Sequence, residues 1–316
     1  MSDSVRTQLK ASASGQNMRK RQSPKRKKSK KPEPAQEQQP QIEEVSYETS
    51  SIEEHANVLF KPNPGPQTEF LAASEREVLY GGSAGGGKSY AMLADPLRYM
   101  GHSQFSGLLL RHTTEELREL IFKSQELYPK IWPGIKWSER KMQWTAPSGA
   151  RLWMSYLDRD DDVLRYQGLA FSWIGFDELT QWATPYAWNY MRSRLRSTAP
   201  DLPIFMRATT NPGGRGHQWV KKMFIDPAPY NRQFDATDTE TGEVLRYPYG
   251  HSKAGKPLFK RRFIPARLSD NPYLAEAGDY EAMLLSLPEQ QRRQLLEGDW
   301  DIKEGAAFTE FDRRVH

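Results

Sequence analysis

The feature that most constrains this chain is the glycine-rich stretch LYGGSAGGGKSYAML at residues 79–93. Five glycines occur within seven positions, and Lys88 and Ser89 follow them directly. The residues EVLYGG are typical of a short buried strand, and apolar residues recur at helical spacing after Lys88, with Pro96 as a candidate kink. A glycine-rich linker turn is the alternative, and the strand and helix on either side disfavour it.

Residues 82–89 match the pattern G-x-x-x-x-G-K-[ST], which predicts a phosphate-binding loop when a strand precedes it and a helix follows. Glycines let backbone N–H groups approach phosphate oxygens that a Cβ would block, and the helix directs its unpaired amides and positive dipole end at the same anion. The lysine reaches the β- and γ-phosphates and the serine ligates Mg²⁺. The expected nucleotide-binding residues are Gly82, Gly85, Gly86, Gly87, Lys88 and Ser89.

A second pattern is the apolar segment FSWIGFDELTQW, which runs into Asp177 and Glu178. An aspartate at a strand end can hold Mg²⁺, and the adjacent glutamate can accept a proton from an attacking water. An Asp-Glu pair alone is more often a solvated strand end. Together with the phosphate-binding loop, it predicts that a bound nucleoside triphosphate is hydrolysed.

The segment IFMRATTNPGG ends a third apolar run in Thr210 and Asn211. At a strand tip beside the phosphate-binding loop, these residues could contact the γ-phosphate or hold the attacking water. A capped turn explains this sequence equally well, because Asn-Pro-Gly-Gly by itself strongly favours a turn.

Strands alternating with helices predict an α/β fold with a central, mainly parallel sheet flanked by helices. The helix TEELRELIFKSQELY is expected to begin at Thr113 or Thr114, a hairpin is expected around PSG, and residues 231–264 read as an exposed β excursion. We expect four regions: a disordered basic tail (1–50), the ATPase core (51–264), a helical lid or linker (265–300) and the start of a further linker (301–316).

The excess of positive charge lies in the N-terminal tail. Residues 1–31 hold eleven Lys or Arg and one Asp, a net of +10, so the remainder carries −5 of the formal +5. The tail could bind phosphates without sequence preference or simply be a solvated segment. The chain contains no cysteine and its six histidines lack metal-ligand spacing, which disfavours a zinc site. No run has the length of a membrane span.

The motifs GGSAGGGKS, LLLRHT, LRYQGLAFSWIGFDELTQW, ATTNPGGRGHQWVKKMFID and LSDNPYL occur in this order. Together they resemble the large terminase subunit of tailed bacteriophages, over roughly residues 58–310. The resemblance implies a RecA-like, ASCE-type ATPase that moves double-stranded viral DNA into a preformed capsid. It implies Lys88 and Ser89 on phosphate and Mg²⁺, Asp177 on Mg²⁺ and Glu178 as catalytic base.

The resemblance also implies further roles. Thr209, Thr210 and Asn211 would form the motif that couples hydrolysis to movement. Gln67 would read the adenine edge, for which its amide offers both a donor and an acceptor; a surface glutamine is the alternative. Arg165 would be a catalytic arginine finger donated to the neighbouring subunit's ATP, and an ion pair with the acidic run DRDDD is the alternative.

The implied partners are double-stranded DNA, the portal protein of the procapsid, the small terminase subunit and further copies of the chain in a ring, with no membrane. The implied location is the cytoplasm of the infected bacterial host. The chain departs from the family pattern in two ways. Ser83 and Ala84 occupy variable loop positions where many terminases have an arginine, and Arg165 would take over the role of that arginine. The nuclease that the family pattern places after GDWDIKEGAAFTEFD is not found before the last residue, His316.

Two other classes fit part of the pattern. A helicase or recombination ATPase would share the phosphate-binding loop, and its hydrolysis would be stimulated by single-stranded nucleic acid. A non-catalytic assembly protein would bind nucleotide as a structural element or switch, and measurable hydrolysis would exclude it.

Overall fold

The computed structural model describes residues 60–302. The predicted tail (1–50) and the chain beyond residue 302 lie outside the described residues. Within the described part, no helix combines the length and the apolar composition that crossing a bilayer requires.

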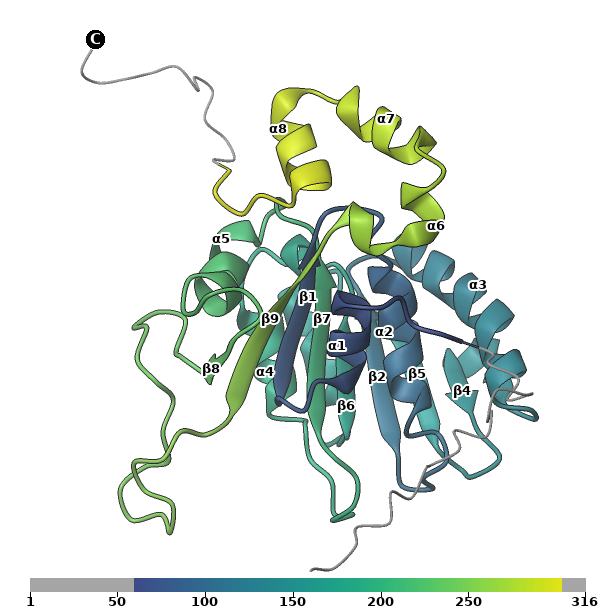
Figure 1. Cartoon of the computed structure of the whole chain (residues 1–316). Helices are drawn as coiled ribbons and strands as arrows, with labels where there is room; N and C mark the ends of the chain where they lie inside the picture. Colours follow the sequence, from purple (N-terminus) through teal and green to yellow (C-terminus); the bar gives the residue numbers. More distant parts are fainter. Residues whose placement is uncertain (1–59, 303–316) are drawn as a thin grey trace, which may run out of the picture. The chain divides into compact units, whose positions relative to one another are not determined.

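The described residues form a nine-stranded sheet in the order β3-β4-β5-β2-β6-β7-β1-β9-β8 (Figure 1). From β5 to β9 in this order, every neighbouring pair of strands is parallel, and antiparallel strands extend both edges. The strands are β1 (Glu77–Gly82), β2 (Ser106–Arg111), β3 (Lys136–Ser138), β4 (Gln143–Thr145), β5 (Arg151–Tyr156), β6 (Trp173–Phe176), β7 (Phe205–Thr210), β8 (Gln233–Asp235) and β9 (Lys260–Ala266).

Helices pack on both faces of the sheet, so the predicted fold class is confirmed. The α-helices are α1 (Pro66–Ala72), α2 (Lys88–Leu97), α3 (Thr114–Ile131), α4 (Tyr186–Arg192), α5 (His217–Val220), α6 (Pro272–Ala275), α7 (Asp279–Leu285) and α8 (Glu289–Arg292). The shorter helical turns are η1 (Glu139–Lys141), η2 (Asp160–Tyr166), η3 (Leu179–Gln181) and η5 (Leu268–Asp270), and two π-helical turns are η4 (Lys221–Ile225) and η6 (Arg293–Glu297).

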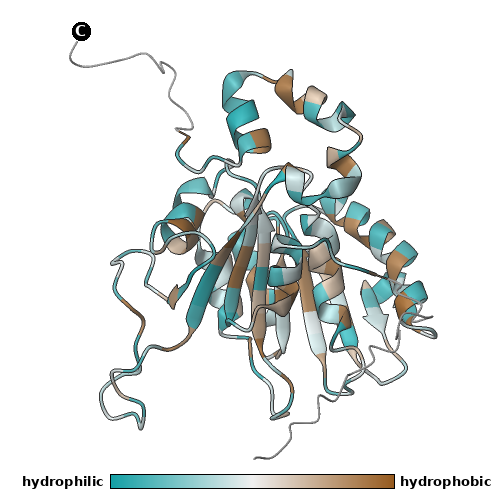
Figure 2. Cartoon of the chain, in the orientation of Figure 1, coloured by the Kyte–Doolittle hydropathy of each residue, from teal (hydrophilic) through white to brown (hydrophobic). Residues whose placement is uncertain are grey.

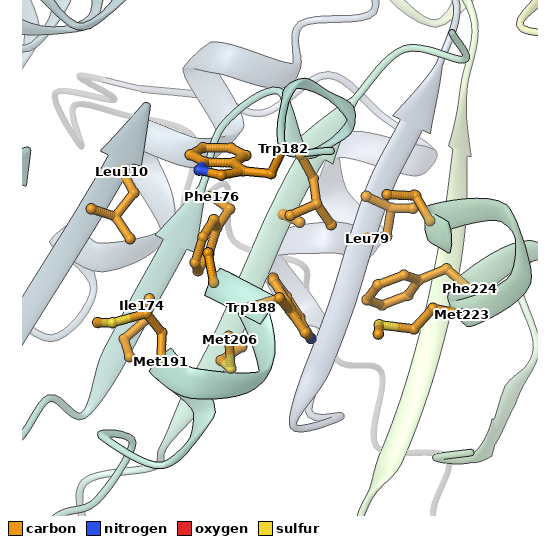
Figure 3. Close-up of a cluster of buried hydrophobic side chains, with 14 of the residues drawn as sticks. Leu79, Leu110, Ile174, Phe176, Trp182, Trp188, Met191, Met206, Met223 and Phe224 are labelled. Carbon is orange, nitrogen blue, oxygen red and sulfur yellow. The ribbon is translucent and has the colours of Figure 1, made fainter. Parts of the chain in front are cut away.

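The central strands bury both of their faces, because successive side chains of a strand point to opposite sides. Leu108 and Leu110 of β2 pack in one cluster with α4 and η4, whereas Leu109 packs in the other with α2 and α3. Figure 3 shows the first cluster, where Trp188 and Phe224 lie among the strand residues. In Figure 2, hydrophobic segments lie within the central strands, and much of α8 is hydrophilic.

The predicted local elements follow their sequence signals. The Thr113 hydroxyl caps α3 by accepting a hydrogen bond from the Glu116 amide at 3.3 Å, which satisfies one orphan donor of the first turn. The predicted hairpin around PSG is present as β4 and β5, with Gly149 at φ +92° in its turn. Helix α2 contains Pro96 and ends one residue later, at Leu97.

Two segments leave the sheet. The connection between β8 and β9 extends beyond the amino end of β9, and α6, α7 and α8 lie beyond the opposite end of the strands (Figure 1). The first lies within the predicted exposed excursion (231–264), but that prediction is wrong for residues 260–264. They belong to β9, which pairs with β1 inside the sheet, and they include the buried Arg261, Phe263 and Ile264. The second lies within the region that we expected to form a lid, a boundary that stays a prediction.

A candidate nucleotide-binding and hydrolysis site

The candidate site lies where the carboxyl ends of four neighbouring parallel strands meet: β2, β6, β7 and β1. The register aligns Leu110 with Phe176 and Phe176 with Ala208, so the next residues on these strands fall at one level. Those residues are Arg111, Asp177 and Thr209. The sheet therefore brings together side chains that lie up to about a hundred positions apart in the sequence.

The glycine-rich loop follows β1 directly and leads into α2, as the sequence predicted. Gly82 has φ +136°, and a Cβ there would lie 2.3 Å from the Ala266 carbonyl oxygen. Gly87 has φ +74°, and its Cβ would lie 2.7 Å from Gln67 Nε2. Gly82 therefore requires glycine for backbone conformation and for space, and Gly87 requires it for its left-handed backbone. Helix α2 begins at the loop with its first amides unpaired by any side-chain cap.

Lys88 is buried at the start of α2, and its ammonium donates to the Ser83 carbonyl of the same loop. Burial lowers the pKa of Lys88, and the negative charges of Glu178 and Asp177 oppose that shift. The lysine of the loop and the acidic pair of β6 thus share one electrostatic environment.

Asp177 is buried and has two partners on neighbouring strands. The Thr209 hydroxyl donates to Asp177 Oδ1, and Arg111 Nη2 forms an ion pair with Asp177 Oδ2 at 2.7 Å. The sequence reasoning assigned no role to Arg111, although its motif LLLRHT was noted. The arginine at the end of an apolar strand could have predicted this ion pair, because a buried guanidinium needs a carboxylate partner.

Glu178 has a strained backbone, with φ +61°, and a perturbed carboxyl group. Burial raises its pKa, the Asp177 charge raises it further, and Lys88 and Arg111 oppose the shift without reversing it. The Asn211 amide also donates to the carboxylate. A non-glycine residue in the left-handed region beside charged groups is typical of functional sites, and the raised pKa brings the carboxylate closer to the proton affinity that a base needs.

The predicted coupling motif bonds to the segment that follows Asp177. The Thr210 and Thr180 hydroxyl oxygens lie 2.7 Å apart, and the Thr180 amide donates to Thr210 Oγ1 at 3.2 Å. The Glu178 amide donates to Thr209 Oγ1 at 3.4 Å. Hydrogen bonds therefore connect the segment that follows Asp177 to the end of β7. Thr180 is a further residue that the sequence reasoning did not single out.

The oxygen atoms present suit a magnesium ion. Mg²⁺ prefers oxygen ligands and keeps waters and phosphates alongside one or two protein ligands. The Ser89 hydroxyl and the Asp177 carboxylate supply that chemistry, and within residues 60–302 no cluster of three or more His, Asp or Glu offers a dedicated protein cage. Asn211 Oδ1 is buried without a hydrogen-bond partner in the described part of the chain, as expected beside a group that brings bound water.

Gln67 lies in α1 and is buried rather than at the surface, with 4% of its area exposed, so the surface alternative is wrong. Its Oε1 accepts from the Asn63 amide at 2.6 Å, and its Nε2 donates to the Gly87 carbonyl at 2.9 Å. Gln67 thereby ties α1 to the phosphate-binding loop. It also lines a pocket of about 620 Å³, together with Phe60, Asn63, Gly87, Tyr90 and Asn271.

Arg165 lies on η2, after β5, with its side chain 47% exposed. Its Nη2 donates to the Tyr156 carbonyl at 2.8 Å, and it forms an ion pair with Asp162 at 3.5 Å. Asp162 belongs to the acidic run, so the ion pair that we considered as the alternative does form in the single chain. It is Arg111, not Arg165, that pairs with Asp177.

The segment after β9 contacts the phosphate-binding loop at its variable positions. The Ala84 amide donates to the Leu295 carbonyl at 2.6 Å, and the Ser83 hydroxyl donates to the Leu296 carbonyl at 2.7 Å. Asn271 Nδ2 donates to the Gly85 carbonyl at 2.7 Å. Ser83 and Ala84, which stand where an arginine was expected, thus connect the loop to η6.

The chain matches a family model described as terminase large subunit, T4likevirus-type, N-terminal, over residues 79–315. A search among curated protein sequences gave no match.

Among solved structures, the large terminase of a thermophilic bacteriophage in complex with ADP aligns with a TM-score of 0.55 and 16% identity, covering 81% of this chain and 57% of that one. The same terminase in complex with ATP-gamma-S gives 0.52 and 13%, with 76% and 53% covered. A variant of the ATPase domain of the Thermus phage P74-26 large terminase gives 0.50 and 12%, with 76% and 94% covered.

At these identities the structural matches establish the fold, which is that of the RecA-like terminase ATPase domain. The chain spans 57% of the length of the ADP-bound terminase. The family model covers well over half of the chain, including the glycine loop, the Asp-Glu strand and the Thr-Thr-Asn strand end. The chain therefore belongs to the family of T4-like large terminase subunits, whose N-terminal model it matches.

Proposed function

We propose that this chain is the ATP-hydrolysing motor part of a viral DNA-packaging enzyme, which moves double-stranded DNA into a preformed capsid. The observation that carries the proposal is the shared environment of Lys88, Asp177 and Glu178 at the carboxyl edge of the sheet. In this proposal, the glycine-rich loop at the end of β1 binds the phosphates and the acidic pair at the end of β6 acts on them, which is what hydrolysis of a nucleoside triphosphate requires.

In this proposal, the loop amides and Lys88 bind the phosphates, and Ser89 and Asp177 hold Mg²⁺. Magnesium, when bound, neutralises charge on the phosphate oxygens. Glu178 orients a water molecule and accepts its proton as the water oxygen attacks the γ-phosphorus. The bond between that phosphorus and the bridging oxygen breaks, and ADP and phosphate are released.

We assign Arg165 as an arginine finger for the neighbouring subunit's ATP. Its guanidinium is half exposed and held by weak surface contacts, so it is free to exchange the Asp162 carboxylate for a phosphate. Hydrolysis then depends on assembly into a ring of identical chains, because each site receives its finger from the adjacent subunit.

Gln67 and the adjacent pocket are assigned to the adenine base. The Gln67 amide is committed to the backbone of Asn63 and Gly87, so it acts by fixing the pocket wall and the loop together. The amides of Asn63 and Asn271 at the same pocket are further donors and acceptors that suit an adenine edge.

Thr209, Thr210 and Asn211 are assigned to coupling. Thr209 contacts Asp177, Thr210 contacts Thr180, and the Asn211 amide contacts Glu178. Loss of the γ-phosphate beside Glu178 would alter these contacts and so displace the end of β7. The lid assigned to residues 265–300 contacts the loop at Ser83 and Ala84.

The proposed partners are double-stranded DNA, the portal protein of the procapsid and the small terminase subunit, in the cytoplasm of the infected host. The proposal is tested by measuring phosphate release from the purified chain with Mg²⁺ and ATP. The assay is run alone, with duplex DNA, with single-stranded DNA, and with procapsids plus small subunit.

We expect low activity alone and stimulation by procapsids and duplex DNA. Stimulation by single strands alone would favour the helicase alternative. No hydrolysis under any condition would contradict the proposal and favour a nucleotide-binding assembly protein.

A further inference from the structure

The connection between β8 and β9 ends in a segment, residues 246–256, that we call the basic tip. All of its residues are exposed except Tyr247, which is half-buried, and Tyr249 is fully exposed. The connection extends beyond the amino end of β9, away from α6, α7 and α8 (Figure 1). The function proposed above assigns nothing to it.

Charge is segregated along this connection. Residues 235–243 contain Asp235, Asp238, Glu240 and Glu243 and no Lys or Arg, whereas residues 244–262 contain six Lys or Arg and no Asp or Glu. The cations of the tip are Arg246, Lys253 and Lys256. The chain after residue 31 has a formal net charge of −5, so the tip is a local departure from its surroundings.

The cations of the tip have no carboxylate partner within residues 60–302, unlike those at its base. Lys260 pairs with Asp235 at 2.6 Å and Arg262 pairs with Glu69 at 2.9 Å. An exposed cation without a partner adds nothing to stability through ion pairing. Several such cations in a segment that contains no Asp or Glu present a positive surface to a partner.

The tip is shaped by its own contacts. The Tyr247 amide donates to the Lys256 carbonyl at 3.0 Å, and the Gly255 amide donates back to the Tyr247 carbonyl at 3.0 Å. The Tyr247 and His251 rings stack at 4.5 Å, and Lys253 lies 5.8 Å from the Tyr247 ring centroid. The contact with the Tyr247 ring restrains the Lys253 side chain, so that less of its side-chain entropy is lost on binding.

We propose that the basic tip binds the sugar-phosphate backbone of duplex DNA. Lys253 and Lys256 neutralise phosphates, and the Tyr249 ring and hydroxyl contact sugar and phosphate oxygens. Such contacts carry no sequence information, which suits a protein that has to hold any part of a genome. The assignment depends on the proposed function for the identity of the partner.

The test compares two variants of the full chain: Lys253→Ala with Lys256→Ala, and Lys130→Ala with Lys141→Ala. The second pair lies at exposed positions of α3 and η1, also lacks a carboxylate partner in the described part of the chain, and changes the charge equally. Affinity for a fluorescent duplex is measured by anisotropy across a salt series, without nucleotide, so the result does not depend on whether the chain hydrolyses ATP.

We expect the slope of log K against log salt to become shallower by about 1.8 for the tip variant, since each phosphate contact contributes about 0.9. The control pair keeps the slope of the unmodified chain. The basic residues of the tail contribute equally in all three proteins, so the difference reports the tip.

A second measurement reports proximity. The chain contains no cysteine, so Ser252→Cys and Ser286→Cys each introduce a single thiol for a photo-crosslinker, in the tip and in the segment after α7. We expect the tip thiol to cross-link to duplex DNA more efficiently than the control. An unchanged slope together with cross-linking no better than the control would overturn the assignment, and binding to an acidic protein instead would then explain the tip. ATP hydrolysis stimulated by DNA in that case would leave the proposed function standing.

Discussion

Arg111 and Asp177 form a buried ion pair, 2.7 Å from Nη2 to Oδ2, at the ends of the neighbouring strands β2 and β6. Asp177 also accepts a hydrogen bond from Thr209, so one carboxylate connects three strand ends. The arginine supplies a positive charge that balances this buried carboxylate. Breaking a buried pair leaves an uncompensated charge, which is strongly destabilising.

Arg111→Ala is expected to lower the stability of the chain by about 3–5 kcal/mol in the absence of nucleotide. Mg²⁺ with a slowly hydrolysed ATP analogue should recover part of that loss, because the metal then supplies the missing charge. Thermal unfolding with and without Mg²⁺ and the analogue measures both effects. Arg118→Ala, at an exposed position of α3, is the control, and an equal shift in the two variants would exclude the structural role of Arg111.

Glu178→Gln should abolish turnover while nucleotide affinity is retained, because the amide keeps the shape of the side chain and cannot accept the proton. Steady-state phosphate release measures turnover, and binding of a fluorescent ATP analogue measures affinity. Gln is preferred to Ala because the Asn211 amide can still donate to its oxygen. Full hydrolysis in this variant would remove Glu178 from the role of base.

Arg165→Ala should depress hydrolysis of the assembled motor by about 10³- to 10⁵-fold and leave the nucleotide affinity of the single chain intact. Arg140→Ala, which removes an exposed arginine from η1, should have no effect on either. A large loss of affinity in the single chain would instead indicate that the contacts of Arg165 with Tyr156 and Asp162 are structural.

Mixing the two inactive variants tests whether Arg165 acts on a neighbour. In a mixed ring, a subunit with Arg165→Ala keeps its own Glu178 and can receive an arginine from an adjacent Glu178→Gln subunit. We therefore expect partial recovery of hydrolysis on mixing. A finger that acted within its own subunit would give no recovery at any ratio.

Glu77→Gln is expected to destabilise the fold by about 3–5 kcal/mol at neutral pH, because Glu77 pairs with the buried Arg261 at 2.8 Å and also with Arg192. Burial by itself raises the pKa of Glu77, but the charges of Arg261 and Arg192 outweigh burial and lower it. Denaturant unfolding of both proteins measures the difference.

The pH dependence of that difference follows from the sign of the shift. A carboxyl group whose folded pKa is lowered contributes stability above its unfolded pKa, near 4.5, and loses it as the pH falls through the lower folded value. The gap between wild type and Glu77→Gln should therefore be full at pH 7 and narrow progressively below about pH 4.5. A gap that stayed constant to pH 3 would show that the ion pairs do not hold the Glu77 pKa down.

The sequence by itself determined the local elements. The glycine-rich loop between strand and helix, the Thr113 cap of α3 and the turn at PSG follow from backbone freedom, side-chain hydrogen bonding and hydrophobic period, which act over a few residues. Because strands alternate with helices, the parallel sheet and the meeting of its strand ends also followed from the order of elements.

The tertiary structure alone decided which side chains share the site. The strand order β2-β6-β7-β1 and its register place Arg111 opposite Asp177, and no local pattern in LLLRHT specifies that partner. The structure likewise shows the amide of Gln67 bonded to the backbone and the loop held by Leu295 and Leu296. Such contacts depend on how distant segments pack, because a hydrogen bond or an ion pair is set by distances of about 3 Å that spacing along the chain does not encode.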